Sequence, residues 1–124
     1  MANKFNAKKV EYKGEKFDSK LECERFKILE VQEEQGLIKN LERQPVFILQ
    51  DKFRYEGKAI IRIKYTADFR YVKVDTGETV IEEVKGYKTE SYKIRYKLFI
   101  KKFVVDKDNV IFKEITRKNL KEIV

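Results

Sequence analysis

The 124-residue sequence contains no histidine and only one cysteine, Cys23. Without histidine there is no Ser-His-Asp or Cys-His triad and no histidine-ligated metal site, and a single cysteine excludes an internal disulfide and a cysteine-rich zinc site. The five glycines are scattered along the chain, so a Gly-rich phosphate loop is missing too. We expect Cys23 to be a small buried hydrophobe. Any catalysis must therefore use carboxylates, lysines, tyrosines and bound hard cations.

Long hydrophobic runs are also missing. No apolar stretch reaches membrane-spanning length, and residues 1–5 show no apolar segment of the signal-peptide type. We therefore expect a cytoplasmic protein without a membrane partner. What the chain does have is charge: 40% of its residues are charged and its net charge is +8, which favours a polyanionic partner. Its 42% hydrophobic content and its length predict one folded domain with its own core.

Local patterns predict an α/β protein. Hairpin turns are expected at residues 12–15, 55–58 and 75–78. The other expected elements, in chain order, are a helix over 19–34, strands over 46–49, 59–74 and 79–85, a helix over 90–102, a strand over 110–112 and a short helix over 117–124. The order is helix, three-stranded meander, helix, strand, which predicts a mixed central sheet with helices on its faces. We assign residues 1–124 to one domain, with an N-terminal arm or hairpin over 1–16, a core over 17–112 and a C-terminal extension over 113–124.

The two main helices have clear sequence signals. Asp18 or Ser19 can cap the first, Ser19-x-x-Glu22 fits a capping box, and Gly36 is a typical C-terminal stop. In the second, four aromatic residues fall at i, i+4, i+7 and i+11 and form one apolar stripe, which predicts core packing. These residues are Tyr92, Tyr96, Phe99 and Phe103. In the strand over 59–74, alternation predicts one apolar face, made of Ile61, Ile63, Tyr65, Ala67, Phe69 and Tyr71.

The hairpin at residues 75–78 brings three charged side chains together. If residues 76–77 form its loop, Asp68 lies opposite Lys85, with Glu83 as its diagonal neighbour on the same face. Glu83 and Lys85 are two apart and project to the same side of their strand. A slip of one residue would instead place Asp68 beside the two neighbours of Glu83. The favoured register therefore predicts two carboxylates and one ammonium converging on one sheet face.

Such a set suits metal-assisted phosphate chemistry. Two close carboxylates repel each other and favour a hard cation, and Mg²⁺ commonly takes only one or two protein carboxylates together with water and substrate phosphate. A bound metal can polarise a phosphoryl oxygen and activate water, and a neighbouring lysine can stabilise the developing charge. We therefore expect hydrolysis of phosphodiester bonds, with Asp68, Glu83 and Lys85 at the centre of the site.

Asp68 followed by Glu83-Val84-Lys85 on the next strand resembles the motif of the PD-(D/E)xK, or restriction-endonuclease-like, nuclease superfamily. The element order resembles that superfamily's core over residues 17–112. Residues 17–22 and 86–88 resemble a family of small phage-associated endonucleases, whereas Ala67 departs from the proline of the superfamily name. The resemblance implies a restriction-endonuclease-like core and an Mg²⁺- or Mn²⁺-dependent DNA endonuclease in a phage or mobile-element context, acting in a bacterial host cell. Asp68, Glu83 and the Val84 carbonyl would be metal ligands, and Lys85 the catalytic lysine.

Glu22 extends the candidate site. On a helical wheel it shares the sheet-facing side with Phe26 and Leu29, where a carboxylate is costly unless it meets a cation or donors. Superfamily members often place an acidic residue on this helix, so the resemblance implies that Glu22 supports the metal. A capping role explains Glu22 as well, and that alternative stays open. Glu24 is turned away from the stripe.

Residues 85–102 contain seven cations and one acidic residue, a surplus of +6. Because this segment follows the expected active-site strand, we expect sequence-independent phosphate contacts from Lys88, and also from Lys93 and Arg95. A solvated helix face is the alternative. Three further cations, on the polar face of the strand before the site, are candidates for the same surface and equally for plain surface charge: Arg62, Lys64 and Arg70.

Two other functions stay open: a non-catalytic nucleic-acid-binding module with a nuclease-like fold, and a basic scaffold protein of a phage or mobile element. Branched DNA, such as a Holliday junction, is a candidate substrate, but no residue pattern reports branch geometry. Cutting both strands of a duplex would need two copies of the site, so we expect a homodimer.

Overall fold

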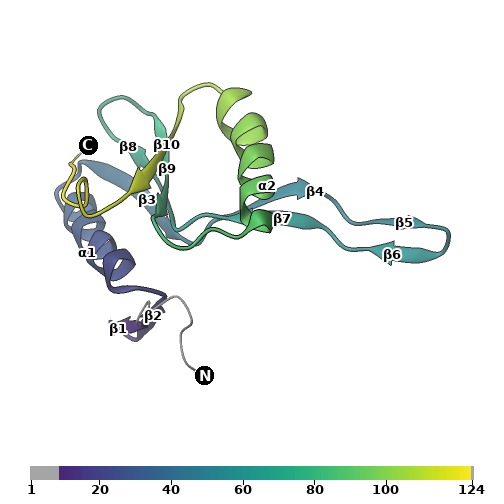
Figure 1. The fold of residues 1–124 in the computed structure, drawn as a ribbon. Helices are drawn as coiled ribbons and strands as arrows, with labels where there is room; N and C mark the ends of the chain where they lie inside the picture. The colour runs from purple at the N-terminus through teal and green to yellow at the C-terminus, as the bar shows by residue number, and fades with distance from the viewer. Residues whose placement is uncertain (1–8, 124) are drawn as a thin grey trace.

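The computed structural model of the protein describes residues 9–123 (Figure 1). Residues 1–8 of the expected N-terminal arm and Val124 of the expected terminal helix lie outside the described residues. The helices are α1 (Lys20–Glu34), α2 (Glu90–Phe99) and the π-helix η1 (Ile100–Val105), which continues α2. The strands are β1 (Val10–Tyr12), β2 (Glu15–Phe17), β3 (Ile38–Arg43), β4 (Val46–Gln50), β5 (Phe53–Tyr55), β6 (Lys58–Ile60), β7 (Ile63–Thr66), β8 (Phe69–Lys73), β9 (Thr79–Val84) and β10 (Val110–Ile115).

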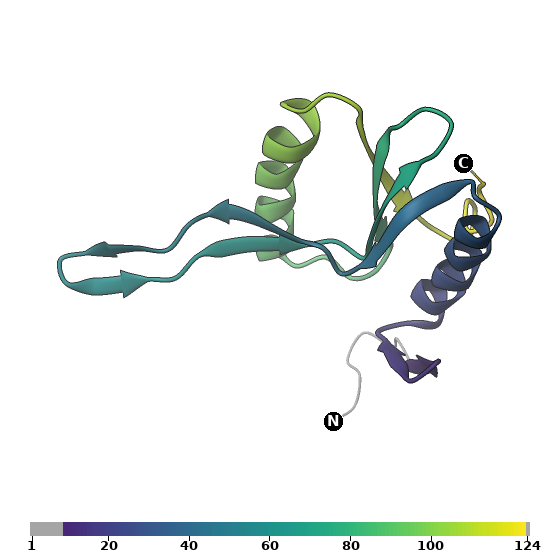
Figure 2. The same ribbon diagram turned by 180° about the vertical axis from the view of Figure 1, so that it is seen from behind.

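A four-stranded sheet in the order β10-β9-β8-β3 forms the centre of the molecule. Strand β8 is antiparallel to both of its neighbours, whereas β10 is parallel to β9. Helix α1 lies against one side of this sheet and α2 against the other (Figures 1 and 2). The prediction of an α/β protein with a mixed central sheet is therefore confirmed.

Helix α1 begins and ends where the sequence predicts. The Ser19 side chain accepts a hydrogen bond from the Glu22 N–H at 3.1 Å, and Gly36 takes a left-handed φ of +77° just past the last turn. Cys23 is 2% exposed and packs in the core, as expected. The Glu22 carboxylate bonds to Arg43, so the structure shows no reciprocal capping contact for Glu22.

Buried side chains cover both faces of the sheet. On the α1 side, Phe26 packs against Phe69, with ring centroids 6.0 Å apart. On the α2 side, Phe99 stacks on Tyr65 at 4.3 Å. The predicted aromatic stripe of the second helix packs into this second cluster with Phe47, Ile81 and Phe112. Because each helix supplies one cluster, the sheet is held between two apolar layers.

Strands β4–β7 form one long hairpin that extends away from the body beside α2 (Figures 1 and 2). At its tip Glu56 and Gly57 have φ of +47° and +75°, the left-handed pair that a tight hairpin turn requires. The turn between β1 and β2 has the same form, at Lys13 and Gly14. The hairpins predicted at residues 12–15 and 55–58 are therefore confirmed.

The predicted first strand of the meander is wrong in its position. Residues 46–49 do form a strand, β4, but β4 pairs with β7 outside the central sheet. The first strand of the sheet is β3, which the sequence patterns did not predict. Of its six side chains only Ile38 is fully buried, because β3 is an edge strand that exposes most of its polar residues.

The continuous strand predicted over residues 59–74 is also wrong. The chain bends at Asp68 and separates β7 from β8. Tyr65 and Ala67 enter the cluster on the α2 side, whereas Phe69 and Tyr71 enter the cluster on the α1 side. Residues of one alternating face are thus divided between the two faces of the sheet. This bend places Asp68 at the junction of the long hairpin and the sheet.

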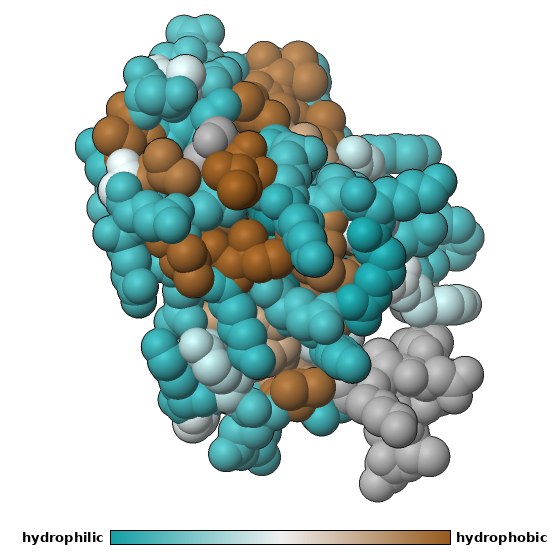
Figure 3. Space-filling view, turned by 90° about the vertical axis from the view of Figure 1, so that its left-hand side faces the viewer, coloured by the Kyte–Doolittle hydropathy of each residue, from teal (hydrophilic) through white to brown (hydrophobic). Residues whose placement is uncertain are grey.

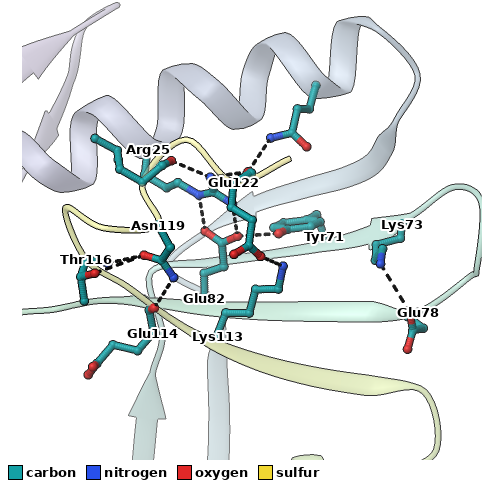
Figure 4. Close-up of polar contacts among 12 residues, drawn as sticks. Arg25, Tyr71, Lys73, Glu78, Glu82, Lys113, Glu114, Thr116, Asn119 and Glu122 are labelled. Carbon is teal, nitrogen blue, oxygen red and sulfur yellow. Dashed lines mark hydrogen bonds and ion pairs between the residues drawn. The ribbon is translucent and has the colours of Figure 1, made fainter. Parts of the chain in front are cut away.

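Residues 117–121 form turns instead of the predicted terminal helix. The buried Arg25 guanidinium donates to the carbonyl oxygens of Leu120 and Glu122, each at 2.8 Å, and makes a bidentate ion pair with Glu82 at 2.8 and 2.6 Å (Figure 4). The Tyr71 hydroxyl donates to the same carboxylate at 2.5 Å. Tertiary contacts with Arg25 therefore fix the C-terminal segment against α1 in a non-helical path.

The end of the molecule opposite the long hairpin carries hydrophobic patches that charged and polar side chains interrupt (Figure 3). Two apolar residues are exposed in and just after α1: Val31, whose exposed fraction is 50%, and Leu37, whose exposed fraction is 38%. Within residues 9–123, no helix is long and apolar enough to cross a membrane.

Candidate active site

An open hollow of about 550 Å³ lies where β8 and β9 meet the N-terminal end of α1. It contains the predicted carboxylates Asp68, Glu83 and Glu22, and also Val84 and Lys85. Its remaining lining residues are Lys9, Asp18, Ser19, Gly86 and Tyr87. The structure therefore brings together in one space the five residues that the sequence assigned to catalysis and metal binding.

The register of the β8–β9 hairpin differs from the prediction by two residues. Phe69 pairs with Glu82, and the Asp68 N–H also bonds to the Glu82 carbonyl at 3.0 Å, so Asp68 lies beside Glu82 and not opposite Lys85. The cause is the turn: the Lys73 N–H bonds to the Glu78 carbonyl at 2.8 Å, which leaves a four-residue loop where two residues were expected. Asp68 and Glu83 nevertheless lie close together, since the Glu83 carboxylate acts on Asp68 and both side chains line the same hollow.

The sequence contains two adjacent glutamates at this point, and the structure separates their surroundings. Glu82 is fully buried and points to the α1 side, where it pairs with Arg25 and Tyr71. Glu83 projects to the opposite face and lines the hollow. Strand alternation thus assigns Glu82 to the core and leaves Glu83 as the carboxylate that faces Asp68.

Asp68 is held by the backbone of the neighbouring strand. Its Oδ2 accepts a hydrogen bond from the Val84 N–H at 2.7 Å. Burial raises the pKa of Asp68 to about 8, repulsion from the Glu83 carboxylate adds to this rise, and the Val84 N–H opposes it. Since the N–H and C=O of one strand residue point to the same edge, the Val84 carbonyl also faces the Asp68 side.

Glu83 is anchored by a pair of tyrosines. The Tyr65 hydroxyl donates to its Oε1 at 2.8 Å and lies 3.1 Å from the Tyr92 hydroxyl. Burial raises the pKa of Glu83, and the hydrogen bond from Tyr65 counteracts part of that rise. Burial and the negative charge of Glu83 in turn raise the pKa of Tyr65, so this tyrosine remains a proton donor to the carboxylate.

Glu22 reaches the hollow from the first turn of α1 and is 3% exposed. Arg43 donates to its Oε1 at 3.2 Å, while the Arg43 guanidinium carbon lies 3.8 Å from the centre of the Phe17 ring. Burial, and next the charge of Asp68, raise the pKa of Glu22 to about 7, against the effect of Arg43. Glu24 pairs with Arg117 and stays outside the hollow, as expected.

The predicted basic residues occupy different surroundings. Lys85 lines the hollow, is exposed, and makes no ion pair within the described residues. Lys88 pairs with Glu114 and lies 5.2 Å from the centre of the Tyr92 ring. Lys93 pairs with Glu90 within its own helix at 3.3 Å. Lys85 and Lys9 are therefore the lysines that line the hollow, and the charge of Lys88 also acts on Glu83.

The other candidate cations lie further from the hollow. Arg95 donates to Ser91 and lines a separate groove beside β7, which it shares with Arg62 and Lys64. Arg70 pairs with Glu42 at 2.8 Å. The charge of Arg70 is thus partly compensated, whereas Arg62 and Lys64 face the groove.

Sequence reasoning missed Arg43 and Tyr65 as parts of this site. Arg43 belongs to β3, which no apolar period indicated, and its contact with Glu22 depends on a fold that joins residues 21 positions apart. Tyr65 was recognised only as an apolar-face residue. The signal that could have identified it is its hydroxyl, since a buried tyrosine needs a polar partner and the carboxylates are the nearest candidates.

The donor set fits a hard divalent cation. Within residues 9–123 no three acidic side chains already stand in the arrangement of a metal shell. The carboxyl groups of Glu22, Asp68 and Glu83 nevertheless line one hollow. Burial raises the pKa of each of them, and the negative charge of a neighbouring carboxylate adds to the rise. A divalent cation would offset that repulsion, and oxygen donors are the ligands that Mg²⁺ and Mn²⁺ prefer.

These features define a mixed α/β protein with an acidic hollow at one end of an antiparallel strand pair. Over residues 2–119 the chain matches the family described as "Protein of unknown function (DUF1064)", and it belongs to that family. No curated protein and no solved structure matches the chain.

Proposed function

We propose that this protein is a metal-dependent endonuclease that hydrolyses phosphodiester bonds of DNA. The observation that carries the proposal is the hollow itself, which Asp68, Glu83 and Glu22 line together with Lys85, a lysine that makes no ion pair within residues 9–123. A carboxylate cluster with a lysine at its edge matches the needs of phosphodiester hydrolysis, which must hold a cation and stabilise negative charge.

The order of the elements that build the sheet supports the proposal. The chain runs α1, β3, β8, β9, α2, β10, with β3, β8 and β9 as an antiparallel meander. This order resembles the helix, three-stranded meander, helix and strand of a restriction-endonuclease-like core, with the long hairpin as an insertion between β3 and β8. Asp68 directly precedes β8, and Glu83-Val84-Lys85 stand at the end of β9, so the residues of the resembling motif meet at one end of this strand pair.

In this proposal each residue has a distinct task. Asp68, Glu83 and the Val84 carbonyl would hold Mg²⁺ or Mn²⁺, and Glu22 would support it from α1. When bound, such a cation supplies Lewis acidity toward a phosphoryl oxygen and acidifies water. Tyr65 keeps Glu83 oriented through its 2.8 Å hydrogen bond. Lys85 would place a positive charge near the phosphoryl oxygens, which gain negative charge as the water oxygen bonds to phosphorus and the bond from phosphorus to the leaving oxygen breaks.

The surroundings of the hollow suit a polyanionic substrate. Lys88, Lys93 and Arg95 lie on or just before α2, which follows the active-site strand. Together with the net charge of +8, they favour backbone contacts that do not depend on sequence. We place the protein in the cytoplasm of a bacterial host in a phage or mobile-element context, with branched DNA as a candidate substrate. A homodimer would supply the two sites that cutting both strands requires.

A plasmid-nicking assay with Mn²⁺ tests the proposal. We expect Asp68→Ala and Lys85→Ala each to abolish nicking without unfolding the protein, and EDTA to abolish nicking by the parent. Matched controls are Asp75→Ala, in the exposed β8–β9 turn, and Lys118→Ala, in the exposed C-terminal turns. Both controls should cleave like the parent.

Full activity in purified Asp68→Ala or Lys85→Ala would exclude the proposed roles of these residues. A parent that binds DNA but does not nick any linear, flapped or four-way substrate would identify a non-catalytic binding module. Activity that survives EDTA unchanged would exclude the metal.

A further inference from the structure

The long hairpin between β3 and β8 is exposed over its whole outer part. Every residue from 50 to 64 is exposed, and we call this segment the β-arm. It projects beyond the body of the protein, past the end of α2 (Figures 1 and 2). A two-stranded ribbon is only marginally stable in water by itself, so a ribbon held away from the core indicates a binding partner.

The β-arm carries both apolar and cationic side chains. Large apolar residues are exposed along it, including Tyr55 at 63% and Ile61 at 81%. Between them stand five cations against two acidic residues, Asp51 and Glu56, a surplus of +3. The five cations are Lys52, Arg54, Lys58, Arg62 and Lys64. Basic residues interleaved with aromatic and apolar ones are typical of nucleic-acid surfaces.

Within residues 9–123 none of these five cations makes an ion pair, whereas Arg70 and Lys88 of the body are paired with glutamates. Three of the five, Lys52, Arg54 and Arg62, line one open hollow of about 700 Å³ on the β-arm. Unneutralised charge gathered around a hollow provides a site for an anionic partner.

The cationic surface continues from the β-arm toward the carboxylates. A second groove follows β7 and is lined by Arg62, Lys64 and Arg95, with Tyr65 and Tyr92 at its inner end. The Tyr65 hydroxyl is the group that bonds to Glu83. A polyanion lying along this groove would therefore extend from the β-arm to the candidate active site.

We propose that the β-arm is a second DNA-binding element that enters a groove of duplex DNA while the duplex backbone follows the β7 groove toward the hollow. The inference deepens the proposed endonuclease function and rests on it. A major groove about 12 Å wide admits a two-stranded ribbon, and cations on both strands can reach the phosphates on either side. The exposed apolar residues would contact sugars and base edges.

Charge decides against a second copy of the chain as the occupant. Two β-arms packed together would bring two surpluses of +3 into contact, and the remainder of the protein is also basic. Like charges brought together at an interface oppose association. A DNA duplex offers the opposite charge along its entire length.

Binding of a fluorescent linear DNA duplex, in EDTA and over a range of salt concentrations, tests the inference. The arm variant carries Lys52→Ala, Arg54→Ala and Arg62→Ala. The control variant removes the same charge outside the β-arm, with Lys39→Ala, Lys118→Ala and Lys121→Ala. Each phosphate contact contributes about 0.9 to the slope of log K against log salt, so losing three lowers it by about 2.7.

In the arm variant, the loss of affinity between about 50 and 200 mM salt should therefore be roughly 40-fold smaller than in the parent. The control variant should keep the parent's slope. If the triple arm variant does not fold, Lys52→Gln with Arg62→Gln keeps the contact between Arg54 and the Gly57 carbonyl and should lower the slope by about 1.8.

Equal slopes in the arm and control variants would overturn the inference. So would an arm variant that binds single-stranded DNA less tightly than the parent while its duplex binding is unchanged, or one in which only the sedimentation mass of the protein changes. The nicking assay separates the two proposals. If the parent does not nick DNA but the arm variant binds the duplex more weakly than the parent, the proposed function fails and the β-arm assignment stands. If the parent nicks DNA but the arm variant binds the duplex as the control variant does, only the β-arm assignment fails.

Discussion

At the scale of single residues, the candidate site is a group of acids held under unfavourable conditions. Asp68, Glu83 and Glu22 share one hollow, and burial raises the pKa of each. Few donors compensate them: the Val84 N–H for Asp68, Tyr65 for Glu83 and Arg43 for Glu22. Sites that lower the stability of the fold in this way are common where function requires them.

The raised pKa values predict a stability that falls with rising pH in the metal-free protein. The pKa of Asp68 is about 8 in the folded state, against about 4 in an unfolded chain. Between these values the folded protein binds more protons, so the free energy of unfolding decreases as pH rises through that window. Asp68→Asn removes the charge and keeps an oxygen that can accept from the Val84 N–H. We expect it to stabilise the metal-free protein by about 1 kcal/mol near pH 8.

Urea unfolding in EDTA at several pH values measures this effect. The gain from Asp68→Asn should disappear below about pH 3, where Asp68 is protonated in both the parent's folded and unfolded states. Asp75→Asn, at an exposed turn residue, is the matched control and should have no pH-dependent effect. A gain that is as large at low pH as at high pH would contradict the explanation.

At the scale of elements, strand β9 decides the roles of two neighbouring glutamates. Glu82→Gln should cost about 3 kcal/mol of unfolding free energy, because it leaves the buried Arg25 guanidinium without its counter-charge. Glu83→Gln, one residue further on, should cost nothing or stabilise the metal-free protein slightly, yet abolish nicking. Urea unfolding and the nicking assay on the two variants measure both effects, and equal destabilisation by the two substitutions would refute the assignment.

The elements with strong local signals could be predicted from the sequence. Helix α1 has Ser19 at its start and Gly36 past its end, and α2 has an aromatic stripe at helical spacing. The hairpin turns could be predicted from the turn residues alone, such as Glu56 and Gly57. In each case the determining information lies within a few residues of the chain, which is where sequence patterns are most informative.

Other elements depend on distant contacts and could not be predicted in this way. Strand β3 is mostly polar, and it forms a strand only because it pairs with β8. The path of the C-terminal turns depends on hydrogen bonds from Arg25, which lies about 95 residues earlier in the chain. The bend at Asp68 divides one alternating pattern between two sheet faces, which strand periodicity does not reveal. The convergence of Asp68 and Glu83 was predicted despite a wrong turn length, because a shift of two residues still leaves Asp68 beside the Glu82-Glu83 end of β9.

At the scale of the whole molecule, different contacts stabilise the two faces of the sheet. The Arg25–Glu82 pair joins α1, the sheet and the C-terminal segment (Figure 4), while the α2 cluster joins the base of the long hairpin to the opposite sheet face. The carboxylates lie where these two halves meet. A cation bound there would therefore connect α1 through Glu22 with both strands of the β8–β9 hairpin.

This arrangement predicts that metal binding stabilises the entire fold. A cation that binds the folded but not the unfolded chain adds about 2.7 kcal/mol at a hundred times its dissociation constant. For a domain of this size, that corresponds to a rise of roughly 10 °C in the unfolding temperature. The rise should be larger near pH 8 than near pH 6, because the cation must displace protons from carboxyl groups with raised pKa values. Calorimetry with Mn²⁺ should show it in the parent and in Asp75→Asn but not in Asp68→Asn or Glu83→Gln, and an equal rise in all four proteins would show that Mn²⁺ binds elsewhere.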